Sequence, residues 1–235
     1  MQRIYMRLLL VGSEYAGARA LARALIEWSR ETMGAFIGVP DEYLIHDHFL
    51  IPNISHPPEF TDEEQEQILA LSPRVKEMIQ RHNIFYHIPF STPGADSVMI
   101  GLHIEDNVYG PLYFDYLVNP DPDDPIMMTR NLFEPWINEF APETVLVLVK
   151  ASPDAIRKRM VERPHKRGVV QKGDIELVLR RFEEEFDQSA LPNKLVIDTT
   201  DATVEESVAE FASKVEPFLT DRDRERKASI RGEDG

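Results

Sequence analysis

Apolar residues along the chain form short continuous runs that are separated by longer stretches with helical spacing. We predict five strands, at residues 7–11, 43–49, 97–103, 144–149 and 195–198. The runs RLLLV and TVLVLV are uninterrupted rather than alternating, which is typical of strands buried on both faces of a sheet. These two runs are therefore expected near the centre of the fold.

The segments between the strands predict helices. Ala20, Leu21, Ala24, Leu25 and Trp28 recur at steps of one, three and four residues, which forms the apolar stripe of a core-facing helix. Capping signals at Thr61-Asp-Glu-Glu64 and Ser152-Pro153 mark two more helix starts. Other helices are expected at residues 73–85, 131–140, 174–188 and 203–219. Alternating strands and helices indicate an α/β fold with a parallel sheet covered on both faces.

No repeat or linker divides the chain, so we expect one domain over residues 1–219. Residues 119–125 are rich in proline and aspartate and predict an exposed loop. Residues 220–235 are almost devoid of apolar side chains, which predicts a disordered polar tail.

The charge and the cysteine content of the chain limit the kinds of molecule that we expect it to bind. Acidic residues exceed basic ones by 41 to 26, for a net charge of -15, and such a surface repels nucleic acids and anionic membranes. The sequence has no cysteine, which excludes disulfides and thiolate metal sites. We therefore predict a cytoplasmic protein with no nucleic-acid or membrane partner. Its oligomeric state stays open, with a homodimer among the options.

A glycine-rich turn follows the first strand and precedes the first helix. It has the layout of a phosphate-binding loop and comprises Gly12, Ser13, Glu14, Tyr15, Ala16, Gly17, Ala18 and Arg19. In such loops backbone amides and the positive end of the helix surround the phosphates. Here Ala18 and Arg19 replace the usual lysine and Ser/Thr. Alanine brings no charge, and arginine does not coordinate magnesium. A plain tight turn between strand and helix is the alternative interpretation.

Two further segments contain charged residues next to predicted strands, and they follow the glycine loop in the same order as in a known superfamily. The first is His103-Ile-Glu105-Asp106 after the third strand, and the second is the strand at residues 145–149 with Ser152-Pro153 and the basic run that follows. Together with the glycine loop, they resemble the P-loop kinases, most closely the nucleoside and nucleotide monophosphate kinases, over residues 7–219. The resemblance implies a five-stranded parallel sheet in the order 2-3-1-4-5, helices on both faces and a small helical lid. Ligands would then bind beyond the carboxyl ends of the strands.

The resemblance also implies roles for individual residues. Glu105 matches the catalytic carboxylate that accepts a proton from the substrate hydroxyl or helps to hold magnesium. Asp47, at the end of the second strand, matches an acidic substrate or metal contact. Arg159, Arg163 and Arg167 match lid arginines, whose guanidinium groups suit phosphoryl oxygens. Asp106 departs from the family pattern, which has arginine at this position.

Each of these features also has a plainer interpretation. Glu105 and Asp106 would equally serve as acidic residues at a helix N-terminus, and the basic run at residues 157–167 as a solvated helix face. His46, Asp47 and His48 allow a metal site but lack a clear third ligand, so no metal ligand is assigned. Three tyrosines, at 109, 113 and 116, form either a pocket for a base or part of the core.

The leading functional hypothesis is ATP-dependent phosphoryl transfer, with Mg²⁺, to a nucleoside, a nucleotide or another small molecule. Such transfer depends on positioning and charge neutralisation, and the loop lacks two of the groups that supply them. The alternative is a weak or inactive pseudokinase that binds nucleotide or phosphate, or acts as an interaction module. A third hypothesis is a phosphate-binding protein whose ligand is not a nucleoside triphosphate.

Overall fold

A computed structural model describes residues 6–34, 45–47, 51, 60–88, 97–118 and 129–232. Its centre is a parallel sheet in which β3, β1, β4 and β5 form the body and the three-residue β2 pairs with β3 at the edge. The strand order is β2-β3-β1-β4-β5. The α/β class and the parallel sheet are thus as predicted. The strands are β1 Arg7–Val11, β2 Ile45–Asp47, β3 Ser97–Ile100, β4 Val145–Lys150 and β5 Asn193–Asp198.

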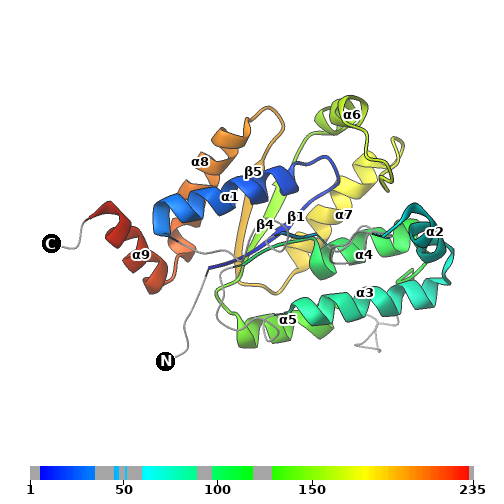
Figure 1. Ribbon diagram of the computed structural model, residues 1–235, viewed down its shortest axis with the longest axis horizontal. Coiled ribbons are helices and arrows are strands. Elements are labelled where there is room, and N and C mark those ends of the chain that lie inside the picture. Colours follow the sequence, from blue (N-terminus) through cyan, green and yellow to red (C-terminus); the bar gives the residue numbers. More distant parts are fainter. Residues whose placement is uncertain are drawn as a thin grey trace.

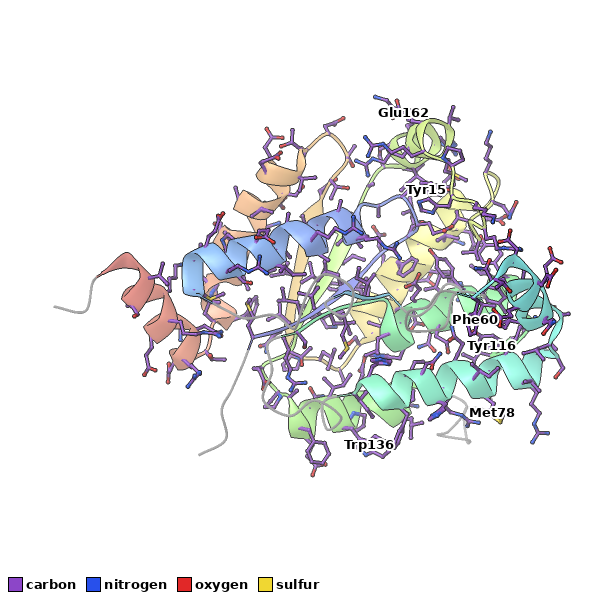
Figure 2. The ribbon with its side chains drawn as sticks, viewed as in Figure 1. Tyr15, Phe60, Met78, Tyr116, Trp136 and Glu162 are labelled. Atoms are coloured by element: carbon purple, nitrogen blue, oxygen red, sulfur yellow. The ribbon has the colours of Figure 1, made fainter. Side chains whose placement is uncertain are left out.

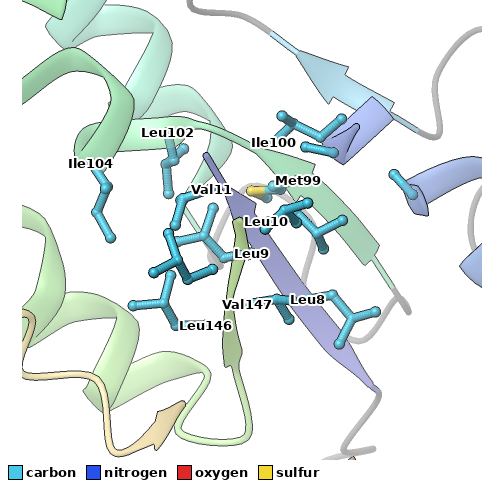
Figure 3. Packing of buried hydrophobic residues seen from close by; sticks show 14 of the residues in the cluster. Leu8, Leu9, Leu10, Val11, Met99, Ile100, Leu102, Ile104, Leu146 and Val147 are labelled. Atoms are coloured by element: carbon cyan, nitrogen blue, oxygen red, sulfur yellow. The ribbon is translucent and has the colours of Figure 1, made fainter. Parts of the chain in front are cut away.

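The core is built around β1. All five of its residues are buried, and its leucines pack among apolar side chains of β3, β4 and α4 (Figure 3). Burying one leucine side chain stabilises a fold by roughly 1.5–3 kcal/mol. The uninterrupted apolar run at residues 8–11 therefore contributes much of the stability of the sheet.

Helices cover both faces of the sheet (Figure 1). On one face α1 and α8 contact the strands, and on the other face α4 and α7 do so, with α3 and α5 packed against α4. Capping predicted at Thr61 and Ser152 is confirmed by bonds from the backbone amides of Glu64 and Ala155. The helices are α1 Ala18–Met33, α2 Asp62–Ala70, α3 Pro73–His87, α4 Leu102–Tyr113, α5 Thr129–Phe140, α6 Pro153–Glu162, α7 Ile175–Gln188, α8 Val204–Val215 and α9 Asp221–Arg231, with a 3₁₀ turn at Glu216–Phe218.

The third strand is shorter than the sequence suggested. β3 ends at Ile100, whereas the prediction extended to residue 103. Gly101 and Leu102 have φ values of 83° and 48°, and these left-handed conformations end an extended strand. The bond from Glu105 N to the Gly101 carbonyl then starts α4. Glu105 consequently lies in the first turn of a helix.

The prediction of a disordered tail is wrong for residues 221–231, which form α9. Thr220 caps this helix by accepting a bond from Asp223 N at 3.2 Å. Asp223 is buried, and α9 packs against α1. Tertiary packing and a cap thus stabilise a helix that has little apolar content of its own.

Two predictions fall partly or wholly outside the described residues. Of the second strand, the structure describes only residues 45–47. The loop expected at residues 119–125 lies outside the described ranges. Within those ranges no helix is both long enough and apolar enough to cross a membrane.

A buried contact between a histidine and a carboxylate joins two of the helices that pack on the sheet. His103 Nε2 lies 3.0 Å from Glu134 Oε1, and both side chains are almost fully buried. Glu134 Oε2 also accepts the backbone N–H of Ala190 at 2.6 Å. Burial raises the pKa of Glu134, but the contact with His103 and the bonds from Ser189 and Ala190 outweigh it, so the pKa is lowered from its usual value. This carboxylate therefore joins α4, α5 and the segment that leads into β5.

Candidate functional site

A cavity of about 760 Å³ lies at the carboxyl ends of the central strands. It is lined by the glycine loop, the start of α1, the end of α6 with the segment that follows, and the turn after β5. In Figure 2, Tyr15 from the loop and Glu162 from α6 lie on this side of the molecule. Of the predicted site residues, those lining the cavity are Gly12, Ser13, Glu14, Tyr15, Gly17, Ala18, Arg19, Glu105, Arg159, Arg163 and Arg167.

The two glycines of the loop are required by its geometry. A Cβ on Gly12 would overlap the carbonyl oxygen of Val149, so β1 and β4 approach too closely for any side chain. Gly17 has a φ of 97° and immediately precedes α1, which has no side-chain cap. The first turn of α1 thus presents the positive end of the helix to the cavity.

Two amides of the loop already donate within the protein. Glu14 N–H donates to the hydroxyl of Tyr109 at 2.9 Å, and Ala16 N–H donates to the carbonyl of Ser13, also at 2.9 Å. Ala16 is fully buried. These two residues, although predicted to contact phosphate, use their amides to hold the shape of the turn.

Ala18 and Arg19 lie where a phosphate-binding lysine and a metal-binding hydroxyl would stand. Ala18 is 9% exposed and faces the cavity, and Arg19 is exposed at its edge. An arginine side chain has no oxygen for a metal ion, so this loop does not fit Mg²⁺ in the usual way. Among the described residues no group of three or more metal-ligating side chains comes together.

Glu105 is brought to the glycine loop by the turn between β3 and α4. Its side chain is buried and lines the cavity, and its carboxylate folds over Gly101, where a Cβ would overlap it. Gly101 therefore provides the space in which the carboxylate lies. Asp47 belongs to β2, but its side chain is not among those the structure describes.

The guanidinium group of Arg159 forms hydrogen bonds with other groups of the protein at the edge of the cavity. One guanidinium nitrogen donates to the Tyr15 carbonyl at 3.0 Å and to Thr199 Oγ1 at 3.1 Å. The other nitrogen donates to the carbonyls of Thr199 and Thr200. Arg159 thus ties α6 to the glycine loop and to the turn after β5.

The other cations of the basic run differ in their surroundings. Lys166 pairs with Asp62 at 2.6 Å, and Arg167 lies 3.7 Å from Glu66, so both contact α2. Arg157 pairs with Asp154 and Glu176 and does not line the cavity. Arg163 lines the cavity, and its side chain has no hydrogen-bond or ion-pair partner within the described ranges. It is therefore the lid arginine best placed to meet an anion.

Several residues that shape the site were not predicted to do so. Thr199 donates its hydroxyl to the Ala16 carbonyl at 2.6 Å, and Tyr109 accepts from Glu14. Thr199 follows β5 directly, and residues at the carboxyl ends of parallel strands converge on one edge, which was the available signal. Tyr109 and Tyr116 are buried in the core, which supports the plainer interpretation of the tyrosines.

Asp106 is buried beside Glu105, and its carboxylate bonds to Tyr116, which follows α4. Its Oδ1 accepts a bond from the Tyr116 hydroxyl at 2.6 Å, and its Oδ2 has no hydrogen-bond partner among the described residues. Burial raises the pKa of Asp106 to about 7, against the lowering effect of the Tyr116 bond. Asp106, where the resemblance implies an arginine, is thus a buried carboxyl group bonded to a tyrosine hydroxyl.

Comparisons with known proteins establish the fold. No protein-family model and no curated sequence matches the chain. Thymidylate kinase from Candida albicans is similar in structure, with a TM-score of 0.58 and 12% identity over 92% of this chain and 93% of that one. Deoxyadenosine kinase from M. mycoides with bound dATP gives 0.52 and 13% over 90% and 100%. The YorR protein from Bacillus subtilis in complex with phosphorylated GDP gives 0.50 and 15% over 91% and 99%. The chain therefore has a P-loop kinase-like fold.

Proposed function

We propose that the cavity binds a nucleoside phosphate, with its phosphates at the glycine turn and the start of α1. One observation carries the proposal: the glycine turn, the Glu105 carboxylate and the Arg163 guanidinium line a single cavity at the carboxyl ends of the strands. The turn and the helix end supply backbone donors and a positive field for the phosphates. Arg163 supplies a positive charge at the cavity wall.

Nucleotides are favoured over other phosphorylated compounds by the structural neighbours. Two of them are kinases of a nucleoside or a nucleotide, and one is in complex with phosphorylated GDP. ATP would then be held by Arg163 and by amides of the glycine turn other than those of Glu14 and Ala16, because Ala18 and Arg19 replace the usual lysine and Ser/Thr.

Phosphoryl transfer in this cavity is expected to be slow. Loss of one well-placed electrostatic donor from a preorganised site costs about 10²–10³ in rate, and the loop lacks both the lysine and the hydroxyl. Arg159 does not fill the gap, because its guanidinium holds backbone carbonyls. The proposed function is therefore nucleotide binding with weak or absent transfer.

An active small-molecule kinase is the second candidate, and Glu105 is the residue that favours it. A buried carboxylate beside the phosphate turn is placed to accept the proton of an acceptor hydroxyl. In that case Glu105 would act as the base and Arg163 would neutralise charge on the transferred group.

Calorimetric titration with ATP, ADP and AMP, each with and without Mg²⁺, tests the proposal. Binding in the micromolar to millimolar range is the expected result, and it should be lost in Ala18→Glu, which places a negative charge at the turn. Absence of binding by the folded wild-type protein contradicts the proposal. Formation of ADP from ATP in single-turnover assays with a panel of nucleosides and nucleotides would favour the kinase, provided that Glu105→Gln abolishes it.

A further inference from the structure

The glycine loop contains a carboxylate in a position that faces the segment after α6. The side chain of Glu14 is 3% exposed, although the loop is part of a large cavity. A buried carboxylate is costly unless hydrogen-bond donors compensate its charge. The donors that surround Glu14 therefore indicate what this residue does.

All of the donors come from one segment, residues 165–170. Glu14 Oε2 accepts the backbone N–H groups of Val169 at 2.8 Å and Val170 at 3.0 Å. Glu14 Oε1 lies 3.1 Å from Nδ1 of His165. Consecutive backbone amides that converge on one anion form a strong binding site for it. The segment thus encloses the carboxylate from two sides.

The next residue of the loop holds the same segment. Tyr15 accepts the backbone N–H of His165 on its hydroxyl at 3.0 Å, and the two rings stack with centroids 4.1 Å apart. Tyr15 has a φ of 66°, a conformation that is uncommon for a bulky residue. Gly168 leaves room for this approach, because a Cβ there would lie 3.1 Å from the Tyr15 hydroxyl.

The far side of the segment is held by α2. Lys166 pairs with Asp62, and Arg167 donates to the Asp62 carbonyl at 3.4 Å. These contacts are exposed, and exposed ion pairs contribute little. The buried contacts with Glu14 and Tyr15 consequently dominate the position of the segment.

We infer that Glu14 is a positioning residue that latches residues 165–170 over the glycine turn. Its carboxylate occupies the amides of Val169 and Val170, so the segment opens only when these bonds break. Opening also leaves a negative charge beside the phosphate turn without its donors. The glycine loop thus controls how a ligand enters the cavity. This effect on ligand entry rests on the proposed nucleotide binding. The contact between Glu14 and residues 165–170 does not depend on that proposal.

Amide hydrogen exchange of Val169 and Val170 tests the latch without any ligand. Glu14→Ala should raise their exchange rates by about 10- to 100-fold, the loss expected for bonds to a charged acceptor. Glu14→Gln should raise them less, because its side-chain oxygen still accepts. Glu162→Gln is the matched control, since Glu162 lines the same cavity but contacts no amide of the segment. Trypsin should cleave after Lys166 and Arg167 fastest in Glu14→Ala, and no faster in Glu162→Gln than in the wild type.

Unchanged exchange and cleavage in a folded Glu14→Ala protein overturn the inference. If that variant does not fold, Glu14→Gln decides, because it keeps the shape of the side chain, removes the charge of the acceptor and should raise exchange at the amides of Val169 and Val170. No change there also overturns the inference.

Stopped-flow binding of the fluorescent nucleotide N-methylanthraniloyl-ADP tests the consequence for access. Both the association and dissociation rates should rise in Glu14→Ala, whereas a purely structural defect would change affinity without accelerating both. If neither the wild type nor the variants bind this probe, the proposed function fails, and the exchange data still decide the latch.

Discussion

Arg159 and Thr199 join three parts of the cavity that are far apart in the sequence. Nη1 of Arg159 lies 3.1 Å from Thr199 Oγ1, and the same nitrogen donates to the Tyr15 carbonyl. Thr199 in turn donates to the carbonyl of Ala16. The two side chains therefore fix the glycine turn relative to α6 and β5, so the arginine acts here as a structural residue.

Replacement of Arg159 by methionine should destabilise the protein. The change keeps much of the apolar stem but leaves several carbonyls without a donor, at a cost of about 1–3 kcal/mol. Chemical denaturation measures this free energy of unfolding. Arg157→Met on the same helix removes only exposed ion pairs and should cost less than about 1 kcal/mol. Equal losses in both variants would contradict a structural role for Arg159.

Restoring the missing loop residues should strengthen ATP binding. In Ala18→Lys with Arg19→Thr the new ammonium reaches the phosphates and the hydroxyl offers a magnesium ligand. We expect a gain of about tenfold or more in affinity, equivalent to roughly 1.4 kcal/mol, by calorimetry with Mg²⁺. Arg19→Thr alone is the control and should not produce this gain. An unaltered affinity in the folded double variant would mean that the loop is not a phosphate site.

Arg163 should contribute to affinity without contributing to stability. Its guanidinium lines the cavity and has no partner within the described residues, so Arg163→Gln should weaken ATP binding by about tenfold, the scale of one charge-assisted contact. Titrations at low and high salt should also show a reduced salt dependence. Lys158→Gln, on the exposed face of α6, should change neither quantity. Loss of stability in Arg163→Gln would contradict the assignment.

The sequence predicted the parts of the fold that depend on local pattern. The apolar runs of β1 and β4 and the caps at Thr61 and Ser152 were recognisable because each signal lies within a few residues. α9 was not predicted, since its stability depends on a buried Asp223 and on contact with α1. The short β3 was also missed, because hydrophobicity does not reveal the positive φ at Leu102.

The site was predictable to the extent that parallel topology brings strand ends together. Gly12 and Glu105 follow strands of the predicted sheet, whereas Arg163 was assigned to the same site by the resemblance, and all three line one cavity. The contacts of Arg159 and Glu14 were not predictable, because their partners are backbone groups distant in the chain. A motif names the residue type, whereas burial and hydrogen-bond partners decide whether that residue meets a ligand or the protein.

Asp106 should make stability depend on pH. Its pKa is raised from 3.8 to about 7 by burial, so the folded state holds a proton that the unfolded state releases. The protonated carboxyl group adds to the free energy of unfolding in full below pH 3.8. This contribution falls as the pH rises from 3.8 to about 7, and it is absent at higher pH.

Asp106→Asn removes this titration while keeping an oxygen that accepts from Tyr116. Relative to wild type, the variant should gain stability as pH rises from 4 to 8, by an amount on the order of 4 kcal/mol for a shift of this size. Urea denaturation at a series of pH values measures the difference, and Asp187→Asn at an exposed position is the control for general charge effects. A stability difference that stays constant across this range would show that Asp106 titrates alike in the folded and unfolded states. Because Oδ1 of Asp106 accepts the Tyr116 bond and Oδ2 has no partner among the described residues, Oδ2 is the atom that would carry the proton in the folded state.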